Sequence, residues 1–296
     1  MTNPSFDPSR RAALSLGVAA AGALFAGQAA ANSLNPREAT ATADPDGPFK
    51  GKVIAVTGGN SGIGEATVRA FAMAGAAVMF CARRDALGRE VEGSVRAAGG
   101  EATWVQTDVR DPDQVKRFVE ATVETYGRID VLFNNAGIFM TPGAIEEISV
   151  ENYRDMMATN ADGVFFGLKY ALPVMKQQGG GVIVNMASVA AHRGFGATAH
   201  YNASKHAVIG MTKAAAATSA KDNIRVVSIS PLAVDTPMLR ESFDFQGLTY
   251  EAMAPNFVTP RIMTAHEMAE AVMFLASDAA TSMNGMDLDV TGGQLA

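Results

Sequence analysis

The feature of this 296-residue sequence that most constrains its fold is a repeated alternation of short apolar runs and helical stretches. Each run has the composition of a buried strand, and the segment after it has helical periodicity. The first four runs cover residues 52–57, 77–81, 102–107 and 129–133. Strands that alternate with helices pair in parallel, with right-handed crossovers that put helices on both faces of the sheet. The sequence therefore predicts an α/β fold.

The first predicted strand runs into the turn GGNSGIG, residues 58–64, and then into a predicted helix. Such a turn gathers backbone N–H groups and a helix N-terminus at one point, where a phosphate can bind. Gly58, Gly62 and Gly64 leave room for it because they have no side chains. Glycine turns also serve as plain connections, so the motif alone leaves a functional and a structural interpretation open.

The second predicted strand is followed by Ala82, Arg83 and Arg84. Dinucleotide-binding folds place here the group that contacts the adenosine ribose, and an acidic residue would bind the 2′-hydroxyl group of NAD. Ala82 occupies the acidic position, and the guanidinium group of Arg83 fits a 2′-phosphate. We therefore expect NADP as the preferred coenzyme and NAD as the alternative. The other interpretation of the arginine pair is a solvated helix start.

Three side chains with catalytic chemistry lie in the stretch SVAAHRGFGATAHYNASK, residues 188–205. Residues 199–220 predict a helix, which would place Tyr201 and Lys205 on one face, one turn apart. A tyrosine has a pKa of about 10, and a nearby ammonium group favours the phenolate, so we expect Lys205 to lower the pKa of Tyr201. Ser188 ends a predicted buried strand, at the edge where parallel sheets bind ligands. The alternative is a packed ring beside a solvated amine.

Composition narrows the possible partners. A net charge of −6 with both signs interspersed lacks the basic stripe of a nucleic-acid surface, so we expect no nucleic-acid partner. The single cysteine, Cys81, excludes an intrachain disulfide and a thiolate metal cluster.

The N-terminal residues have the layout of a secretory signal. Arg10 and Arg11 precede a mildly apolar stretch, which ends before Ala29, Ala30 and Ala31. The stretch is shorter than the ~20 residues that span a bilayer, so we expect no stable membrane insertion. The arginine pair resembles a twin-arginine export signal, which predicts cleavage after residue 31 and a periplasmic protein. An uncleaved, disordered tail on a cytoplasmic protein is the alternative.

Residues 32–51 are polar, contain three prolines and have no hydrophobic period, so we expect a linker. A single folded domain is then expected at residues 52–296.

Further motifs follow in the sequence: TGGNSGIG at residues 57–64, Asp108, NNAG at residues 134–137, Asn160, Ser188, and Tyr201 with Lys205. In this order and spacing they make residues 52–293 resemble the short-chain dehydrogenase/reductases. The resemblance implies one Rossmann-like, doubly wound domain with a seven-stranded parallel sheet, which binds NADP or NAD. The dinucleotide contacts that it implies are Gly58, Asn60, Ser61, Gly62, Ile63, Gly64, Arg83, Arg84, Asp108, Val109, Asn135, Ala136, Gly137, Tyr201, Lys205, Pro231, Val234 and Thr236.

The resemblance also implies an active site made of Asn160, Ser188, Tyr201 and Lys205. Tyr201 would be the general acid/base, Ser188 would orient the substrate oxygen, and Lys205 would also hold the nicotinamide ribose. Asn160 would position a water in a proton relay, and no metal is needed. The residues themselves support this, because a phenol within hydrogen-bond reach can supply or take the proton of the reacting oxygen.

Two stretches concern the substrate. Pro231 is followed by Leu232 where the family usually has glycine, which would narrow the pocket or strain the turn. Residues 235–260 are long for a connection and rich in methionine and phenylalanine, which suggests a lid over an apolar substrate. Ordinary packing or an oligomer contact is the alternative. Two histidines before the tyrosine, His192 and His200, are expected at the surface.

We therefore expect an oxidoreductase that interconverts a small secondary alcohol and a ketone. Apolar surface on the C-terminal helix predicts a homodimer or homotetramer. An enzyme of the same fold that acts on a sugar or a 3-oxoacyl thioester is one alternative. The other is a binding protein that retains its cofactor without turnover, which the intact Ser188, Tyr201 and Lys205 argue against.

Overall fold

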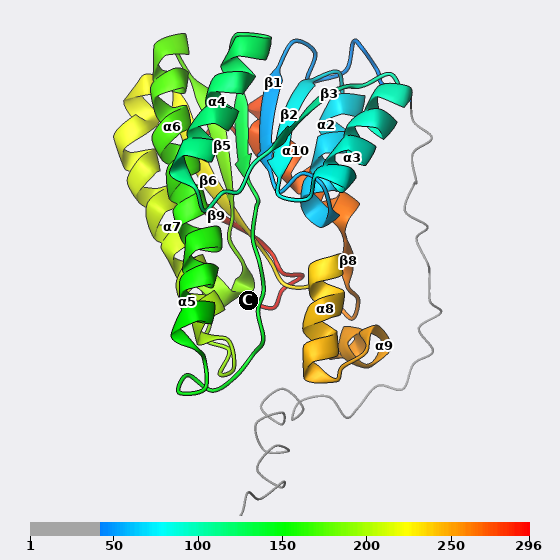
Figure 1. The fold of residues 1–296 in the computed structure, drawn as a ribbon, viewed down its shortest axis with the longest axis vertical. Helices are drawn as coiled ribbons and strands as arrows, with labels where there is room; N and C mark the ends of the chain where they lie inside the picture. Colours follow the sequence, from blue (N-terminus) through cyan, green and yellow to red (C-terminus); the bar gives the residue numbers. More distant parts are fainter. Residues whose placement is uncertain (1–41) are drawn as a thin grey trace, which may run out of the picture.

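The computed structural model describes residues 42–296 (Figure 1). The predicted signal at residues 1–31 and the first part of the predicted linker lie outside the described residues. A seven-stranded parallel sheet forms the centre, with the strand order β3-β2-β1-β4-β5-β6-β9. Its strands are β1 (Val53–Thr57), β2 (Ala77–Ala82), β3 (Glu101–Gln106), β4 (Val131–Asn134), β5 (Gly181–Met186), β6 (Ile224–Pro231) and β9 (Asp287–Val290). The predicted Rossmann-like α/β fold is confirmed.

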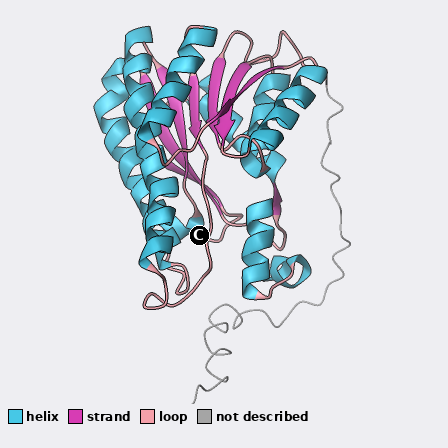
Figure 2. Cartoon of the chain, viewed as in Figure 1, coloured by secondary structure: helices cyan, strands magenta, loops and turns pink. Residues whose placement is uncertain are grey.

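Helices cover both faces of the sheet (Figure 2). On one face they are α2 (Gly62–Met73), α3 (Asp85–Ala97) and α10 (Ala265–Ala276). On the other they are α4 (Pro112–Tyr126), α6 (Gly163–Gln178) and α7 (Ala199–Ser219). The strands feed two cores because successive side chains point to opposite faces: Ile54 and Val56 pack with the first layer, and Ala55 with the second. This two-sided burial explains why the strands are continuous apolar runs.

The folded domain begins earlier than the sequence predicts. Residues 43–51 are not a free linker, because the backbone N–H groups of Ala43 and Asp44 donate to the carbonyl oxygens of Ala98 and Met73 at 3.0 and 2.9 Å. Phe49 is 7% exposed and packs edge-on against Phe71 of α2, with ring centres 4.8 Å apart. The linker prediction is therefore wrong for these residues. It is based on local polar residues and prolines, which do not indicate an aromatic contact with a residue far along the chain.

Several shorter elements lie at the carboxyl edge of the sheet, below it in Figure 1. They are α5 (Val150–Met157), α8 (Pro237–Gln246), α9 (Tyr250–Met253) and the strand pair β7 (Val234–Asp235) and β8 (Met263–Thr264). At the same edge, β4 lies beside β1 although the chain forms β2 and β3 between them. The order of the sheet reverses here, which is where such sheets bind ligands. None of the helices in the described part of the chain is long and apolar enough to span a membrane.

Candidate active site

The glycine turn between β1 and α2 packs so closely against the end of β4 that larger residues do not fit. Gly58 has a φ of +70°, and a Cβ atom on it would lie 2.8 Å from the Cα atom of Ala136. A Cβ atom on Gly64 would lie 2.1 Å from the carbonyl oxygen of Gly58. The turn therefore presents bare backbone at the carboxyl edge of the sheet, as close approach of a pyrophosphate requires.

The N-terminus of α2 starts at this turn and has no side-chain cap. Ser61 stands in the capping position, but its hydroxyl group accepts a hydrogen bond from Arg84 at 2.8 Å. Gly62, with a φ of +55°, and Ile63 begin the helix. A phosphate at an uncapped N-terminus meets backbone N–H groups and the positive end of the helix dipole. The turn and helix therefore fit the predicted dinucleotide.

Asn135 and Ala136 connect the end of β4 to the end of β1. The hydroxyl group of Thr57 accepts hydrogen bonds from both backbone N–H groups, each at 3.0 Å. The Asn135 amide donates to the carbonyl oxygens of Thr57 and Gly58 at 3.0 and 3.2 Å. These bonds hold the glycine turn in place against β4.

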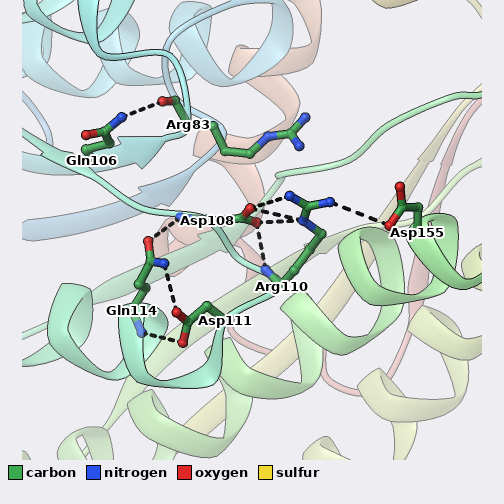
Figure 3. Close-up of polar contacts among 7 residues, drawn as sticks. All are labelled: Arg83, Gln106, Asp108, Arg110, Asp111, Gln114 and Asp155. Carbon is green, nitrogen blue, oxygen red and sulfur yellow. Dashed lines mark hydrogen bonds and ion pairs between the residues drawn. The ribbon is translucent and has the colours of Figure 1, made fainter.

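Arg83 and Arg84 follow β2 at the predicted adenosine end of the site. Arg84 makes two hydrogen bonds: its guanidinium group donates to Ser61, and its carbonyl oxygen accepts from the Asn60 amide at 3.0 Å. The carbonyl oxygen of Arg83 accepts from Gln106 at 2.9 Å (Figure 3). Within residues 42–296 the guanidinium group of Arg83 makes no hydrogen bond or ion pair, so it is free to meet a ligand.

Asp108 and Val109 follow β3, next to the arginine pair. The two strand ends are in register, because the N–H group of Thr107 donates to the carbonyl oxygen of Ala82 at 2.9 Å. Val109 is buried, with 6% exposure. The carboxylate of Asp108 is held by Arg110, whose hydrogen bonds lower the pKa of that carboxyl group.

Tyr201 and Lys205 lie one turn apart on α7, with Nζ of Lys205 5.6 Å from the centre of the tyrosine ring. The lysine is 4% exposed, and Nζ donates to the carbonyl oxygen of Met186, the last residue of β5, at 2.9 Å. Ser188 comes just after this strand, and its Oγ atom accepts from the N–H group of Ala190 at 3.2 Å. The fold therefore gathers the predicted ammonium, phenol and hydroxyl groups at the carboxyl edge of the sheet.

Asn160 lies in a π-helical turn, Ala158–Asp162, between α5 and α6. Its Oδ1 atom accepts from the N–H group of Ile138 at 2.8 Å, and its Nδ2 atom donates to the carbonyl oxygen of Ile138 at 3.0 Å and to Oγ of Ser204 at 3.2 Å. Gly137 fits beside it, since a Cβ atom there would lie 3.3 Å from this Oδ1 atom. The side chain therefore clamps the segment after β4 to α7. Its predicted role in holding a water stays a prediction.

The chain that leaves β6 passes close to the glycine turn. It contains three of the predicted coenzyme contacts, Pro231, Val234 and Thr236. Val234 is buried in β7, and the Thr236 hydroxyl caps α8 by accepting from the N–H group of Leu239 at 3.3 Å. A Cβ atom on Gly62 would lie 3.1 Å from Cγ2 of Thr236. The predicted nicotinamide and pyrophosphate contacts are thus adjacent.

The segment expected to be a lid packs largely on itself. Its apolar side chains form a small cluster around Phe243, which is 8% exposed, and Leu232 packs against that cluster. Leu232 does not strain its turn, because its φ is not positive. Asn223 is the only non-glycine residue with positive φ in the described part of the chain. Ordinary packing therefore accounts for most of this segment, whereas Met238 and Phe245 are 37% and 45% exposed.

Comparison with known proteins decides the family. A family model described as enoyl-(acyl carrier protein) reductase matches residues 58–294. The 2,5-dichloro-2,5-cyclohexadiene-1,4-diol dehydrogenase of Sphingobium indicum is 38% identical over 246 residues, covering 83% of this chain and 97% of the relative. Cyclohexanol dehydrogenase of Acinetobacter sp. strain SE19 is 34% identical over 244 residues, covering 82% and 95%. The chain belongs to the short-chain dehydrogenase/reductase family.

A solved structure agrees with this assignment. The crystal structure of a variant actinorhodin polyketide ketoreductase with NADPH matches with a TM-score of 0.79 and 35% identity, covering 86% of this chain and 99% of that one. The protein is accordingly an NAD(P)-dependent oxidoreductase of the short-chain dehydrogenase/reductase family.

The electrostatics of this short-chain dehydrogenase/reductase differ from the sequence prediction at Tyr201. Burial raises the pKa of the phenol, and hydrogen bonding to Ser188 only partly opposes this shift. Burial also lowers the pKa of Lys205 from 10.5 to about 8. The expected lowering of the tyrosine pKa by the lysine is therefore wrong for this structure, because burial raises the pKa of the phenol by more than the hydrogen bond to Ser188 lowers it.

Three residues that matter here were missing from the predicted site. Thr57 is a polar residue at the end of a buried strand, and its position in the TGGNSGIG motif could have indicated it. Arg110 binds Asp108, which lies two residues before it in the chain. The closeness of these opposite charges in the sequence could have indicated the contact. His200 is 1% exposed although we expect it at the surface, and burial lowers its pKa. His192 is partly exposed and pairs with Asp287 at 2.7 Å.

Removal of the buried ammonium group should change how stability depends on pH. Below about pH 8 both folded and unfolded chains carry the proton of Lys205, and between there and pH 10.5 only the unfolded chain does. Stability rises with pH wherever the unfolded state binds more protons. Relative to Lys205→Met, the wild-type protein should therefore gain about 3 kcal/mol in free energy of unfolding across that range. Urea unfolding without nucleotide measures this difference.

Lys213→Met is the matched control, because Lys213 is exposed on the same helix. Its stability difference from wild type should not vary over this pH range. A difference for Lys205→Met that is equally constant would show that the lysine keeps its ordinary pKa in the folded protein.

Proposed function

We propose that the protein reduces a cyclic, largely apolar ketone to a secondary alcohol, and catalyses the reverse reaction, with NADP as its preferred coenzyme. The observation that carries the proposal is the convergence of Ser188, Tyr201 and buried Lys205 beside the end of β5. These groups suit an oxygen atom that gains or loses a proton as a hydride arrives or leaves.

Tyr201 would act as the general acid in reduction. Because burial raises the pKa of its phenol, the hydroxyl group remains protonated at neutral pH and can donate to the carbonyl oxygen of a substrate. Ser188 would hold the same oxygen through its hydroxyl group. Lys205 adds positive charge near the phenol in its protonated state, which stabilises the phenolate left after proton donation. The bound nicotinamide supplies or accepts the hydride.

The dinucleotide would lie across the carboxyl edge of the sheet. The bare turn at Gly58, Gly62 and Gly64 and the uncapped α2 would hold the pyrophosphate. Arg83 would bind a 2′-phosphate, because the residue is exposed and its guanidinium group makes no hydrogen bond or ion pair within residues 42–296. Lys205, whose Nζ atom is bound to the last residue of β5, would also hold the nicotinamide ribose.

The names of the relatives and one side chain at the site support the proposed substrate class. The two relatives named above are dehydrogenases of a cyclohexadiene diol and of cyclohexanol. In this chain Phe139 packs edge-on against Tyr201, with ring centres 5.2 Å apart. An aromatic ring beside the catalytic phenol favours an apolar carbocycle over a sugar or an acyl thioester.

Tyr201→Phe should lower turnover by about 10²- to 10⁴-fold, since the reacting oxygen loses its proton donor. The dissociation constant for NADPH, measured by nicotinamide fluorescence, should change little. Turnover is best measured with a panel of cyclic ketones, linear ketones, sugars and 3-oxoacyl thioesters, each with NADPH and with NADH. Tyr126→Phe is the matched control, because its hydroxyl group bonds Thr103 on β3, at 2.8 Å, away from the catalytic residues. Nucleotide binding without turnover of any ketone would instead favour the binding-protein alternative.

We also propose that residues 1–31 export the protein to the periplasm. The support is the order of paired arginines, mild apolar stretch and small residues in the sequence. A twin-arginine system carries folded proteins, so the enzyme would load its nucleotide before export. Replacing Arg10 and Arg11 with lysine should leave the uncleaved protein in the cytoplasm of a bacterial host. An unchanged distribution between cell fractions would reject the signal.

A homodimer or homotetramer is the assembly we propose. Large apolar side chains are exposed on two separate helices, Phe165 on α6 at 49% and Phe274 on α10 at 40%. Light scattering should give two or four copies, and Phe165→Glu or Phe274→Glu should reduce that number because a carboxylate resists burial. A monomer at micromolar concentration would contradict the proposal.

A further inference from the structure

The carboxylate of Asp108 is almost fully occupied by one neighbour, Arg110 (Figure 3). Nε of Arg110 donates to both carboxylate oxygens at 3.0 Å, Nη2 donates to Oδ2 at 2.6 Å, and the backbone N–H group donates to Oδ1 at 3.0 Å. A carboxylate has about four acceptor positions, so these bonds leave little capacity for another donor. A forked arginine–carboxylate pair of this kind is held in one geometry and carries no net charge.

The pair is held from both sides. The N–H group of Asp108 donates to Oε1 of Gln114 at 2.9 Å, and Gln114 is bound in turn to Asp111, the cap of α4. The other end of the Arg110 guanidinium group faces Asp155 on α5, with Nη1 3.5 Å from the carboxylate. The second contact is weaker, because the Asp155 side chain is 46% exposed.

Arg83 lies close to this pair but does not join it. It follows β2, whose end is in register with that of β3, so Arg83 and Asp108 project from neighbouring strand ends. Arg83 is near enough to lower the pKa of Asp108, after the larger effect of Arg110. Figure 3 draws no bond from its guanidinium group to the carboxylate of Asp108.

We propose that Arg110 is a positioning residue for coenzyme choice: by pairing with Asp108, it keeps Arg83 free to bind the 2′-phosphate of NADP. This rests on the proposed preference for NADP. Without Arg110, the negative charge of Asp108 would stand uncompensated beside Arg83. The carboxylate would then compete for the guanidinium group and repel the phosphate. NADH carries no phosphate there, so its binding would change little.

The test compares the dissociation constants of NADPH and NADH by nicotinamide fluorescence, using the full-length protein. In Arg110→Gln, NADPH should bind about tenfold more weakly, and NADH should change by less than about twofold. Arg110→Lys keeps the charge and should retain most of the preference. Adding Asp108→Asn to Arg110→Gln should restore the ratio, since it removes the uncompensated carboxylate. The loss in Arg110→Gln should shrink at about 0.5 M salt, where exposed charges are screened.

Arg117→Gln is the matched control, because it removes one exposed positive charge from α4 without touching Asp108. Its ratio of dissociation constants should equal that of wild type. An equal weakening of both coenzymes in Arg110→Gln, or an unchanged ratio, overturns the inference while the proposed NADP preference stands. If Arg110→Gln does not fold, loss of the preference in Arg110→Lys would overturn it. A wild-type protein that binds NADH as tightly as NADPH would overturn both, and one that binds neither would overturn the proposed function itself.

Discussion

The hydrogen bond from the Lys205 ammonium group to the Met186 carbonyl oxygen is the interaction on which the active site depends. It crosses from α7 to the end of β5 and therefore fixes the helix that carries Tyr201 against the strand that leads to Ser188. Burial of a charge with so few partners is unfavourable, and the lowered pKa of Lys205 reports that cost. The role proposed for Lys205 beside Tyr201 is an adequate reason for the fold to tolerate the cost.

The glycine turn depends on a similar constraint at the neighbouring strands. A Cβ atom would fit neither on Gly58, which lies against Ala136, nor on Gly64, which lies against Gly58, and the Thr57 hydroxyl group joins β4 to β1. Two requirements meet here: the backbone must be bare for a phosphate, and the strands must be joined firmly enough to keep it so. These contacts hold the surface in one geometry, which suits a coenzyme that must present one carbon to the catalytic groups.

The two ends of the site use charge differently. At the catalytic end, burial governs the protonation of both groups, because Lys205 is buried and Tyr201 is partly buried. At the adenosine end the side chains are more exposed, and their hydrogen bonds decide which charged groups are available to a ligand. Arg84 binds Ser61 and Arg110 binds Asp108, whereas the guanidinium group of Arg83 has no such partner within residues 42–296. Exposed pairs are individually weak, so this end is better suited to choosing between coenzymes than to holding the fold together.

The sequence alone determined the order of strands and helices, the glycine turn, and the identities of Tyr201, Lys205, Ser188 and Asn160 as neighbours in space. The elements and the turn follow from local periodicity and composition, whereas the set of four residues follows from the resemblance to the short-chain dehydrogenase/reductases that the motifs carry. Only the tertiary structure decided that Phe49 belongs to the folded domain, that the segment containing Phe243 packs mainly on itself, that Tyr201 has a raised pKa, and that Arg110 neutralises Asp108. Each of these depends on which distant side chains approach and on how much water they exclude, and neither quantity is contained in a local pattern of residues.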